Sequence, residues 1–491
     1  MTAYPHTAPR PSSRAPARLA RIVSLALLAL SAQAYAQALP PLPSAAFAPI
    51  NDQQQIVAGA RGLWFVPGYG MALDLKQSKA ELYHYAGGLC WRDPVVPEAL
   101  LIQQFIPYYG RSQHPRDFAF ALSPESTQLH AQAATALPAS CAAGIDRSSA
   151  LYQFDAATFA LRDYYAFAGE RGVDWSRRIA RLRPSAAVAR SPTELRAIFT
   201  ELLRGLDDAH TGISGEIDGH KFAIESERGY TFRRLREIHA RQSTSKTFFE
   251  WLPDWLAEQR RQADGLLLPG TRKELLDGKL VWGRLEGNVG YLQIAQMMEF
   301  GKEGLAEDRR LIGENLDKAL LDLQGTDSLV LDIAHNIGGS DEVSNEIAAR
   351  FADRSRLAYT KHAIAATAVR PQPFRAEPRG QAQYRKPVYL LTSELTASAA
   401  EVFGLLMRSL PNVLQVGQPT QGVFSDALFK ALPNGWHLTL SNEVYRDSRG
   451  EVFEGRGLPP DLAIAVYPAQ DFDNGYRKAL GRVARVAARQ H

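Results

Sequence analysis

Residues 390–401 read LLTSELTASAAE: an apolar run, a short polar loop and the start of a stretch of small residues. The pattern predicts a buried strand that leads through the loop into a helix beginning near Ser398. The first amides of a helix have no acceptor within it, and the helix dipole favours an anion there. Ser398 is therefore a candidate nucleophile, with the amide of Ala399 as a candidate oxyanion donor. The simpler interpretation is that Thr396 or Ser398 only caps the helix.

Two glycines follow another apolar run. Residues 330–340 read VLDIAHNIGGS, which predicts a buried strand that ends in a turn. Gly338 and Gly339 would allow the backbone to approach a ligand closely and would supply a second oxyanion donor. A plain turn before the next helix is the alternative.

A histidine stands at the predicted end of a helix further upstream. Residues 203–211 read LRGLDDAHT, and His210 is one of eleven histidines in the chain. A histidine of unperturbed pKa can act as a general base near neutral pH, although a solvated or capping side chain would look the same in the sequence.

Strands and helices alternate from about residue 280 onward, which predicts a layered α/β domain. The predicted elements are strand 289–294, helix 305–323, strand 328–333, a helix from 341, strand 387–391, helix 398–410, strand 413–416 and a hairpin around 434–435.

The preceding part of the chain is predicted to form two smaller units. Short β-like runs with close turns predict a small β domain over residues 40–145. Helical periodicity at 191–206 and 248–262 predicts a helical domain over 150–275, in which Trp251 and Trp255 are core residues. An α/β core over 280–470 and a C-terminal helix over 471–491 complete the expected organisation.

The first 36 residues resemble a secretory signal peptide. Four arginines precede the short apolar run 22–30, and the small-x-small sequence AYA follows at 34–36. An uncleaved anchor is the alternative, but the run is shorter than the roughly 20 residues that span a bilayer. The sequence thus predicts a periplasmic or secreted protein without a membrane span after cleavage. Export also permits a disulfide between Cys90 and Cys141, although two free thiols would give the same sequence.

The charge balance and the cysteine count exclude several classes of partner. The chain has 56 basic and 52 acidic residues, and four of the basic ones lie in the signal segment. A neutral mature protein lacks the basic surplus that nucleic-acid binding needs, so no nucleic-acid partner is expected. The two cysteines form no metal-ligand cluster, and no nucleotide motif occurs, so no metal or cofactor is predicted.

Five ordered motifs resemble the serine peptidase family of tail-specific (C-terminal processing) proteases, the tricorn protease core and the interphotoreceptor retinoid-binding protein. They are residues 331–339, 396–401, 416–422, 432–435 and 454–461, with the element 207–211 upstream. The resemblance covers roughly 285–467 and implies a ββα crotonase/ClpP-like core. The processing branch uses a serine–lysine dyad, but Val423 occupies the position of its lysine.

The tricorn-like branch implies a different set of catalytic residues. Carried over one by one, Ser398 would be the nucleophile, His210 the general base and Glu454 the carboxylate that orients it, with Glu443 and Glu451 as alternatives to Glu454. A serine hydroxyl needs such a base, and the base needs a third group that fixes it. By the same resemblance, the amides of Gly338, Gly339 and Ala399 would hold the oxyanion.

Two departures from the family leave the assignment open. His335 stands where the family usually has arginine or asparagine, which makes it a rival base. No clear PDZ-like segment lies between His210 and the core. A separate SxxK match at Ser243–Lys246 lacks the companion motifs of penicillin-binding enzymes and is attributed to chance.

The predicted function is an exported serine-type peptidase that cleaves a peptide or protein substrate through an acyl-enzyme. The alternative, implied by the retinoid-binding relatives, is a non-catalytic protein that binds an apolar ligand on the same fold. The sequence leaves the oligomeric state open.

Overall fold

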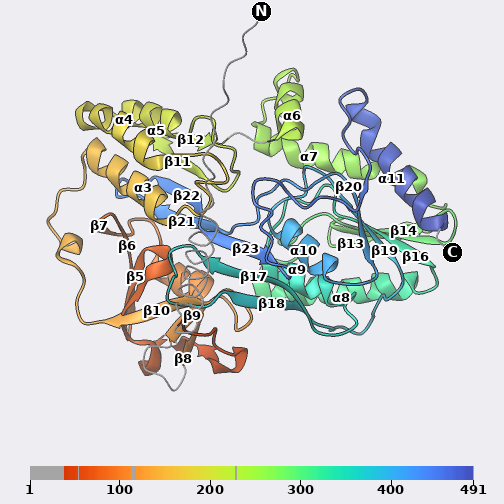
Figure 1. Ribbon diagram of the computed structural model, residues 1–491, viewed down its shortest axis with the longest axis horizontal. Helices are drawn as coiled ribbons and strands as arrows, with labels where there is room; N and C mark the ends of the chain where they lie inside the picture. Colours follow the sequence, from red (N-terminus) through yellow and green to blue (C-terminus); the bar gives the residue numbers. More distant parts are fainter. Residues whose placement is uncertain (1–37, 53–54, 112–117, 227–228, 490–491) are drawn as a thin grey trace, which may run out of the picture.

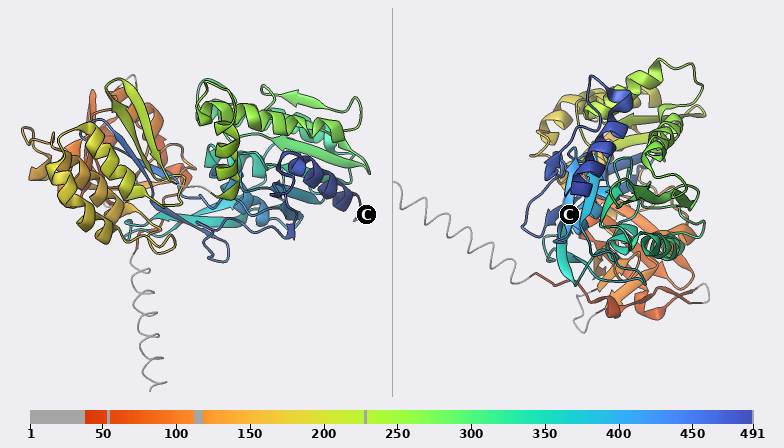
Figure 2. Two further views of the ribbon diagram at one scale, coloured as in Figure 1. Left: turned by 90° about the horizontal axis from the view of Figure 1, so that it is seen from above. Right: turned by 90° about the vertical axis from the view of Figure 1, so that its right-hand side faces the viewer.

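The computed structural model describes residues 38–489 except 53–54, 112–117 and 227–228. Two lobes lie side by side along the long axis of the molecule (Figures 1 and 2). The predicted signal segment at 1–36 lies outside the described residues. None of the helices in the described part combines the length and apolar character needed to cross a bilayer.

One lobe is built around an eight-stranded antiparallel sheet. In spatial order its strands are β1 (Phe47–Pro49), β8 (Tyr108–Arg111), β9 (Phe118–Ala121), β10 (Leu129–Ala134), β4 (Gly62–Val66), β5 (Met71–Lys76), β6 (Lys79–Ala86) and β7 (Leu89–Arg92). The short β-like runs of the sequence are thus confirmed as strands. Trp64 stacks on Phe118 with ring centroids 3.9 Å apart, and both rings are buried in the core.

Three helices cover this lobe: α3 (Ala150–Tyr164), α4 (Trp175–Val188) and α5 (Pro192–Leu203). Helix α5 confirms the predicted helix at 191–206, because Ser191 caps it, Pro192 opens it and Gly205 follows it with a positive φ of 68°. A disulfide joins Cys90 at the end of the sheet to Cys141, on the segment that leads into α3.

A hairpin follows α5, where the sequence predicts a helix-rich region. Strands β11 (Gly212–Ile217) and β12 (His220–Glu225) meet at Asp218 and Gly219, whose φ values of 50° and 79° suit a tight hairpin turn. The hairpin pairs with β22 (His437–Ser441), which pairs with β21 (Ala427–Ala431). Strands from the C-terminal part of the chain therefore belong to the same core as the N-terminal lobe.

The second lobe holds a seven-stranded mixed sheet. Its order is β13 (Lys273–Leu275), β14 (Leu280–Leu285), β15 (Val289–Ile294), β16 (Ser328–Asp332), β19 (Val388–Thr392), β20 (Val413–Gly417) and β24 (Leu462–Ala463), parallel from β15 onward. Its helices are α8 (Leu305–Leu323), α9 (Asp341–Ala348), α10 (Ala399–Arg408) and α11 (Phe472–Arg489). The predicted mixed α/β class is confirmed.

Helices α6 (Tyr230–Ala240) and α7 (Phe248–Arg261) pack on the second lobe (Figure 1). Trp251 is buried in a cluster with Tyr389 and Tyr476, and Trp255 packs beside it, so both are core residues as the sequence predicts. The predicted helical region is therefore divided, with α3 to α5 on one lobe and α6 and α7 on the other.

A three-stranded sheet connects the lobes. Strand β17 (Arg356–Ala363) lies between β18 (Gln372–Ala376) and β23 (Glu443–Asp447). Seen from above, these strands run between the two lobes (Figure 2). The segment after α5, which contains His210, and the start of α10 at Ser398 lie on the two sides of this junction.

Candidate active site

Ser398 lies on a sharp turn between strand β19 and helix α10. Its φ of 55° is in the left-handed region, which a residue other than glycine seldom adopts. Among residues 395–400 it is the one side chain that is not buried. The turn is held to the neighbouring strand end because the Thr396 hydroxyl donates to the carbonyl of Ile333, at 3.0 Å. Thr396 therefore anchors the turn, and Ser398 presents its hydroxyl at the helix start.

The two glycines pack directly against this turn. Gly338 has a φ of 110°, and a Cβ on it would lie 2.7 Å from the Cβ of Ser398, so only glycine fits. Its own N–H donates to Oδ1 of Asn336, at 2.9 Å. The N–H groups of Gly339 and Ala399 donate to no acceptor in the described part of the chain. Two of the three amides that the sequence indicated are thus available to an oxyanion, whereas the amide of Gly338 is occupied.

A buried carboxylate connects the turn to a distant segment. Glu401 accepts from the N–H of Ser398 at 3.2 Å, and from the N–H groups of Gly422 and Val423 at 2.7 and 2.8 Å. Burial raises the pKa of Glu401 to about 7. Glu401 is not among the site residues predicted from the sequence, although the serine–glutamate spacing of a capping box at residues 398 and 401 is a signal for it.

A second buried carboxylate holds the next two residues of the same segment. Glu454 accepts from the N–H groups of Phe424 and Ser425, at 2.8 and 3.1 Å. Its other oxygen accepts from Nη2 of Arg171, at 2.7 Å. Burial, with Asp208 nearby, raises the pKa of Glu454 to about 8, against the opposing effect of Arg171. The segment 422–425 is therefore fixed by two carboxylates, Glu401 on one side and Glu454 on the other.

His210 is attached to the end of this segment. Its Nδ1 lies 2.5 Å from the backbone carbonyl oxygen of Ser425. A carbonyl can only accept, so Nδ1 carries the proton and Nε2 is left as the basic nitrogen. The backbone N–H of His210 donates to the buried Asp208, at 3.0 Å. The Nδ1 proton is thus accepted directly by the carbonyl of Ser425. Glu454 does not contact the ring in this bond; it holds Ser425, the residue to which the carbonyl belongs.

The same four residues link the two candidate catalytic groups. Ser398 in the second lobe is tied through Glu401 to residues 422 and 423, and His210 in the first lobe is tied to residue 425. Arg171, from the first lobe, donates to both Glu454 and the carbonyl of Gly422. The site therefore forms only where the lobes meet.

His335 occupies a different environment. It is 2% exposed, its Nε2 hydrogen-bonds to the hydroxyl of Tyr467, and its ring packs against Tyr476 with centroids 4.3 Å apart. Burial lowers its pKa well below the usual value. Its Nε2 is occupied by Tyr467 and its ring packs among aromatic side chains, so the geometry does not support His335 as the base.

The remaining candidates from the sequence lie outside the site. Glu443 is buried and pairs with Tyr69 and Lys361, and Glu451 is exposed. Ser243 is exposed, and Lys246 forms an ion pair with Asp254. In the described ranges, no three histidine, cysteine, aspartate or glutamate side chains are grouped as metal ligands.

Replacing Glu401 tests the link between the turn and the segment. Glu401→Gln places an NH₂ group against backbone donors, so at least one N–H of Gly422 or Val423 loses its acceptor in a buried site. We expect the rate of serine acylation by a fluorophosphonate probe to fall about 10- to 100-fold, because misplacement of reacting groups costs that much. Glu307→Gln is the matched control, since Glu307 also accepts two backbone N–H groups, at the distant start of α8. Equal acylation rates in the wild type and in Glu401→Gln would contradict the link.

Residues 288–464 match the family described as peptidase family S41. A carboxy-terminal-processing protease of Bartonella bacilliformis is 25% identical over 215 residues, which is 43% of this chain and 46% of that protein. The chain thus spans about half the length of this curated relative. The resemblance predicted from the sequence is confirmed.

Solved structures share the fold. A putative peptidase from Parabacteroides merdae aligns with a TM-score of 0.53 at 24% identity, over 68% of this chain and 97% of that one. Mature CPAF complexed with lactacystin aligns with a TM-score of 0.51 at 14% identity, over 69% and 98% of the two chains. The similarity therefore extends well beyond the residues that the family model matches.

Proposed function

We propose that the protein is an exported serine peptidase that hydrolyses peptide bonds through an acyl-enzyme, with Ser398 as nucleophile and His210 as base. The observation that carries the proposal is the segment 422–425, which joins the turn of Ser398 to the ring of His210 through buried hydrogen bonds. The match to peptidase family S41 supports the same chemistry.

The geometry supports a two-step acyl transfer. Nε2 of His210 takes the proton of the Ser398 hydroxyl as Oγ attacks the substrate carbonyl carbon. The negative oxygen of the tetrahedral intermediate accepts from the free N–H groups of Ala399 and Gly339. His210 then gives the proton to the leaving amine, the peptide bond breaks, and an ester remains on Ser398. In the second step His210 takes a proton from a water molecule as the water oxygen attacks the ester carbonyl carbon. The bond from that carbon to Oγ then breaks, and His210 returns the proton to Ser398.

Glu454 serves in this mechanism as a positioning residue. It holds the N–H groups of Phe424 and Ser425, and the Ser425 carbonyl holds the Nδ1 proton of His210. The imidazolium that forms during catalysis is stabilised by this carbonyl.

The finer features of the proposal follow the resemblance. The core over 280–470 would have the ββα crotonase/ClpP-like architecture, and the β domain at 40–145 would precede it. The substrate class is peptide or protein, and the name of the Bartonella relative favours a polypeptide processed near its C-terminus. The sequence at 1–36 supports periplasmic or secreted localisation.

Covalent labelling of the full-length mature protein tests this function. A fluorophosphonate probe should form a one-to-one adduct, and mass spectrometry of a digest should place it on the peptide that contains Ser398. Protein unfolded in guanidinium is the control and should remain unlabelled, because the hydroxyl then has no base. A folded protein that does not react would favour the non-catalytic binding protein for an apolar ligand.

A further inference from the structure

A buried lysine lies close to the segment that holds His210. Lys361, on strand β17, is 1% exposed. Its Nζ lies 2.7 Å from Oδ2 of Asp426 and 3.0 Å from Oε2 of Glu443, and it donates to the hydroxyl of Tyr445 at 2.7 Å. A buried ammonium group is tolerated when it is paired in this way. These residues all lie on the sheet and loop that connect the lobes.

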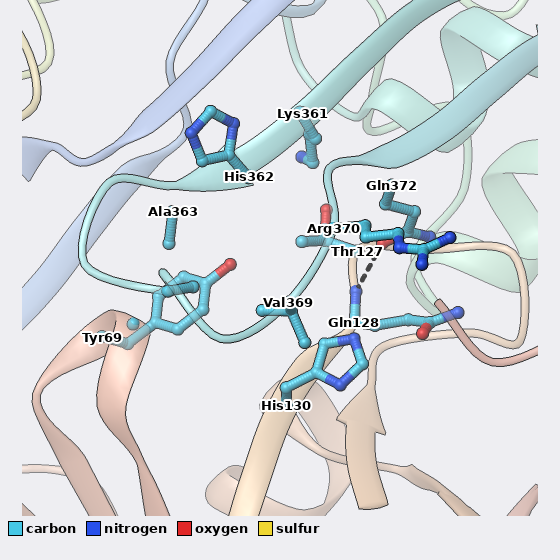
Figure 3. Close-up of a pocket in the computed structure, with 12 residues that line it drawn as sticks. Tyr69, Thr127, Gln128, His130, Lys361, His362, Ala363, Val369, Arg370 and Gln372 are labelled. Carbon is cyan, nitrogen blue, oxygen red and sulfur yellow. Dashed lines mark hydrogen bonds between the residues drawn. The ribbon is translucent and has the colours of Figure 1, made fainter. Parts of the chain in front are cut away.

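The N-terminal β domain reaches this cluster with one side chain. Tyr69 ends the short turn Pro67–Tyr69 between β4 and β5, and its hydroxyl donates to Oε1 of Glu443. Figure 3 shows Tyr69 and Lys361 among the residues that line a small cavity between the β domain and the connecting sheet. The β domain and the connecting sheet thus meet here.

The backbone of the same turn is held by a second lysine. Nζ of Lys430 donates to the carbonyls of Tyr69 and Gly70, at 2.8 and 2.9 Å. Lys430 is fully buried on strand β21, which begins two residues after Ser425. The turn therefore contacts the chain downstream of Ser425 through its carbonyls and Glu443 through its hydroxyl.

Glu443 connects Tyr69 to the residue that orients His210. The backbone N–H of Glu443 donates to Oγ of Ser425, at 3.0 Å. The backbone carbonyl of Ser425 accepts from Nδ1 of His210. Without the Tyr69 hydroxyl, Oε1 of the buried Glu443 carboxylate would lose its hydrogen-bond donor. Glu443 would then have to move toward Lys361. Such a shift would displace the Ser425 carbonyl, because the two residues are directly hydrogen-bonded.

We propose that Tyr69 is a positioning residue for the catalytic base: the N-terminal β domain holds Glu443, and through it the Ser425 carbonyl that orients His210. The inference rests on the proposed function, since it assumes that His210 acts on Ser398. It assigns the β domain a part in catalysis itself, in addition to any part in substrate binding.

The test compares Tyr69→Phe with the wild type in the full-length mature protein. The variant removes one hydroxyl and keeps the ring. We expect kcat per active site to fall about 10- to 100-fold with KM changed less than threefold, because the defect lies in the orientation of the base and not in substrate contacts. Active sites are counted with the fluorophosphonate probe, so that misfolded protein does not enter kcat.

A matched control and a double variant separate positioning from stability. Tyr109→Phe changes another tyrosine of the β domain, which packs on Phe118, and should leave kcat unchanged. Glu443→Gln also alters the ion pair with Lys361, so its effect is measured in both backgrounds. Glu443→Gln should lower kcat less in the Tyr69→Phe background than in the wild type, because the hydrogen bond between the two residues is already lost there. Equal kcat per active site in Tyr69→Phe and the wild type, or fewer active sites with normal kcat, would overturn the inference. A wild type that never reacts with the probe would instead overturn the proposed function.

Discussion

Ser398→Ala is expected to abolish both fluorophosphonate labelling and peptide cleavage, while the thermal midpoint of unfolding stays within about 2 °C of the wild type. The loss is complete because the hydroxyl supplies the bond that forms in the first step. Stability is unaffected because Ser398 is only half-buried and its hydroxyl adds little packing. Its backbone N–H, which donates to Glu401, remains in the variant. Labelling stoichiometry and differential scanning calorimetry measure the two effects.

Ser243→Ala is the matched control for this experiment. Ser243 is the serine of the SxxK match, and it is exposed on the loop between helices α6 and α7. Its replacement should change neither labelling nor cleavage. Persistent labelling of Ser398→Ala would show that another residue is the nucleophile, and persistent cleavage without labelling would point to chemistry that needs no serine.

Much of the second lobe is predictable from local sequence patterns. The apolar runs at 328–333 and 387–391 become the fully buried strands β16 and β19, because parallel strands covered on both faces read as continuous apolar segments. The start of α10 is predictable from small residues after a polar loop. These signals are local, and each needs only about ten residues of sequence to be recognised.

The arrangement of the lobes could not be predicted in the same way. The hairpin of β11 and β12 joins its sheet through β11, whose partner β22 lies more than 200 residues further along the chain and pairs in turn with β21. The residues of β11 and β12 alternate between buried and exposed only in the context of that sheet. Helical patterns on either side therefore dominated the prediction for 150–275, and the division of its helices between two lobes had no local signal.

The orientation of His210 had no sequence signal either. Its Nδ1 partner is a backbone carbonyl, and every residue has one, so residue type at position 425 carries no information. Glu454 was identified through the motif before the GLPPD sequence, but its contact with the base runs through backbone amides. A side-chain motif can indicate which groups take part, whereas the path between them depends on the folded backbone.

In the proposed mechanism, the position of His210 makes catalysis depend on both lobes. Ser398 and the two free amides belong to the α/β lobe, and His210, the proposed base, belongs to the lobe that contains the β domain. Two residues of the first lobe support the segment 422–425 from outside. Arg171 bonds to Glu454 and Tyr69 bonds to Glu443, and each of these glutamates is hydrogen-bonded to Ser425. Any change in the contact between lobes is therefore expected to alter the rate of the chemical step before it alters the fold of either lobe.

His210→Ala should lower kcat by about three to four orders of magnitude, the loss expected when a triad base is removed. Its fold should survive, since the ring is only half-buried. Glu454→Gln should lose less, about 10- to 100-fold. The glutamate acts through Ser425, and a glutamine oxygen in the place of Oε2 can still accept both N–H groups, whereas the NH₂ group would face the donor Nη2 of Arg171.

His335→Gln is the comparison that separates the two histidines. His335 is buried against Tyr467 and Tyr476, so its replacement should lower the thermal midpoint. The rate per active site should nevertheless remain that of the wild type, because Nε2 of His335 is bonded to Tyr467 and not to Ser398. The reverse pattern, with normal kcat in His210→Ala and a large loss per active site in His335→Gln, would move the base into the α/β lobe and make the contact between lobes irrelevant to the chemistry.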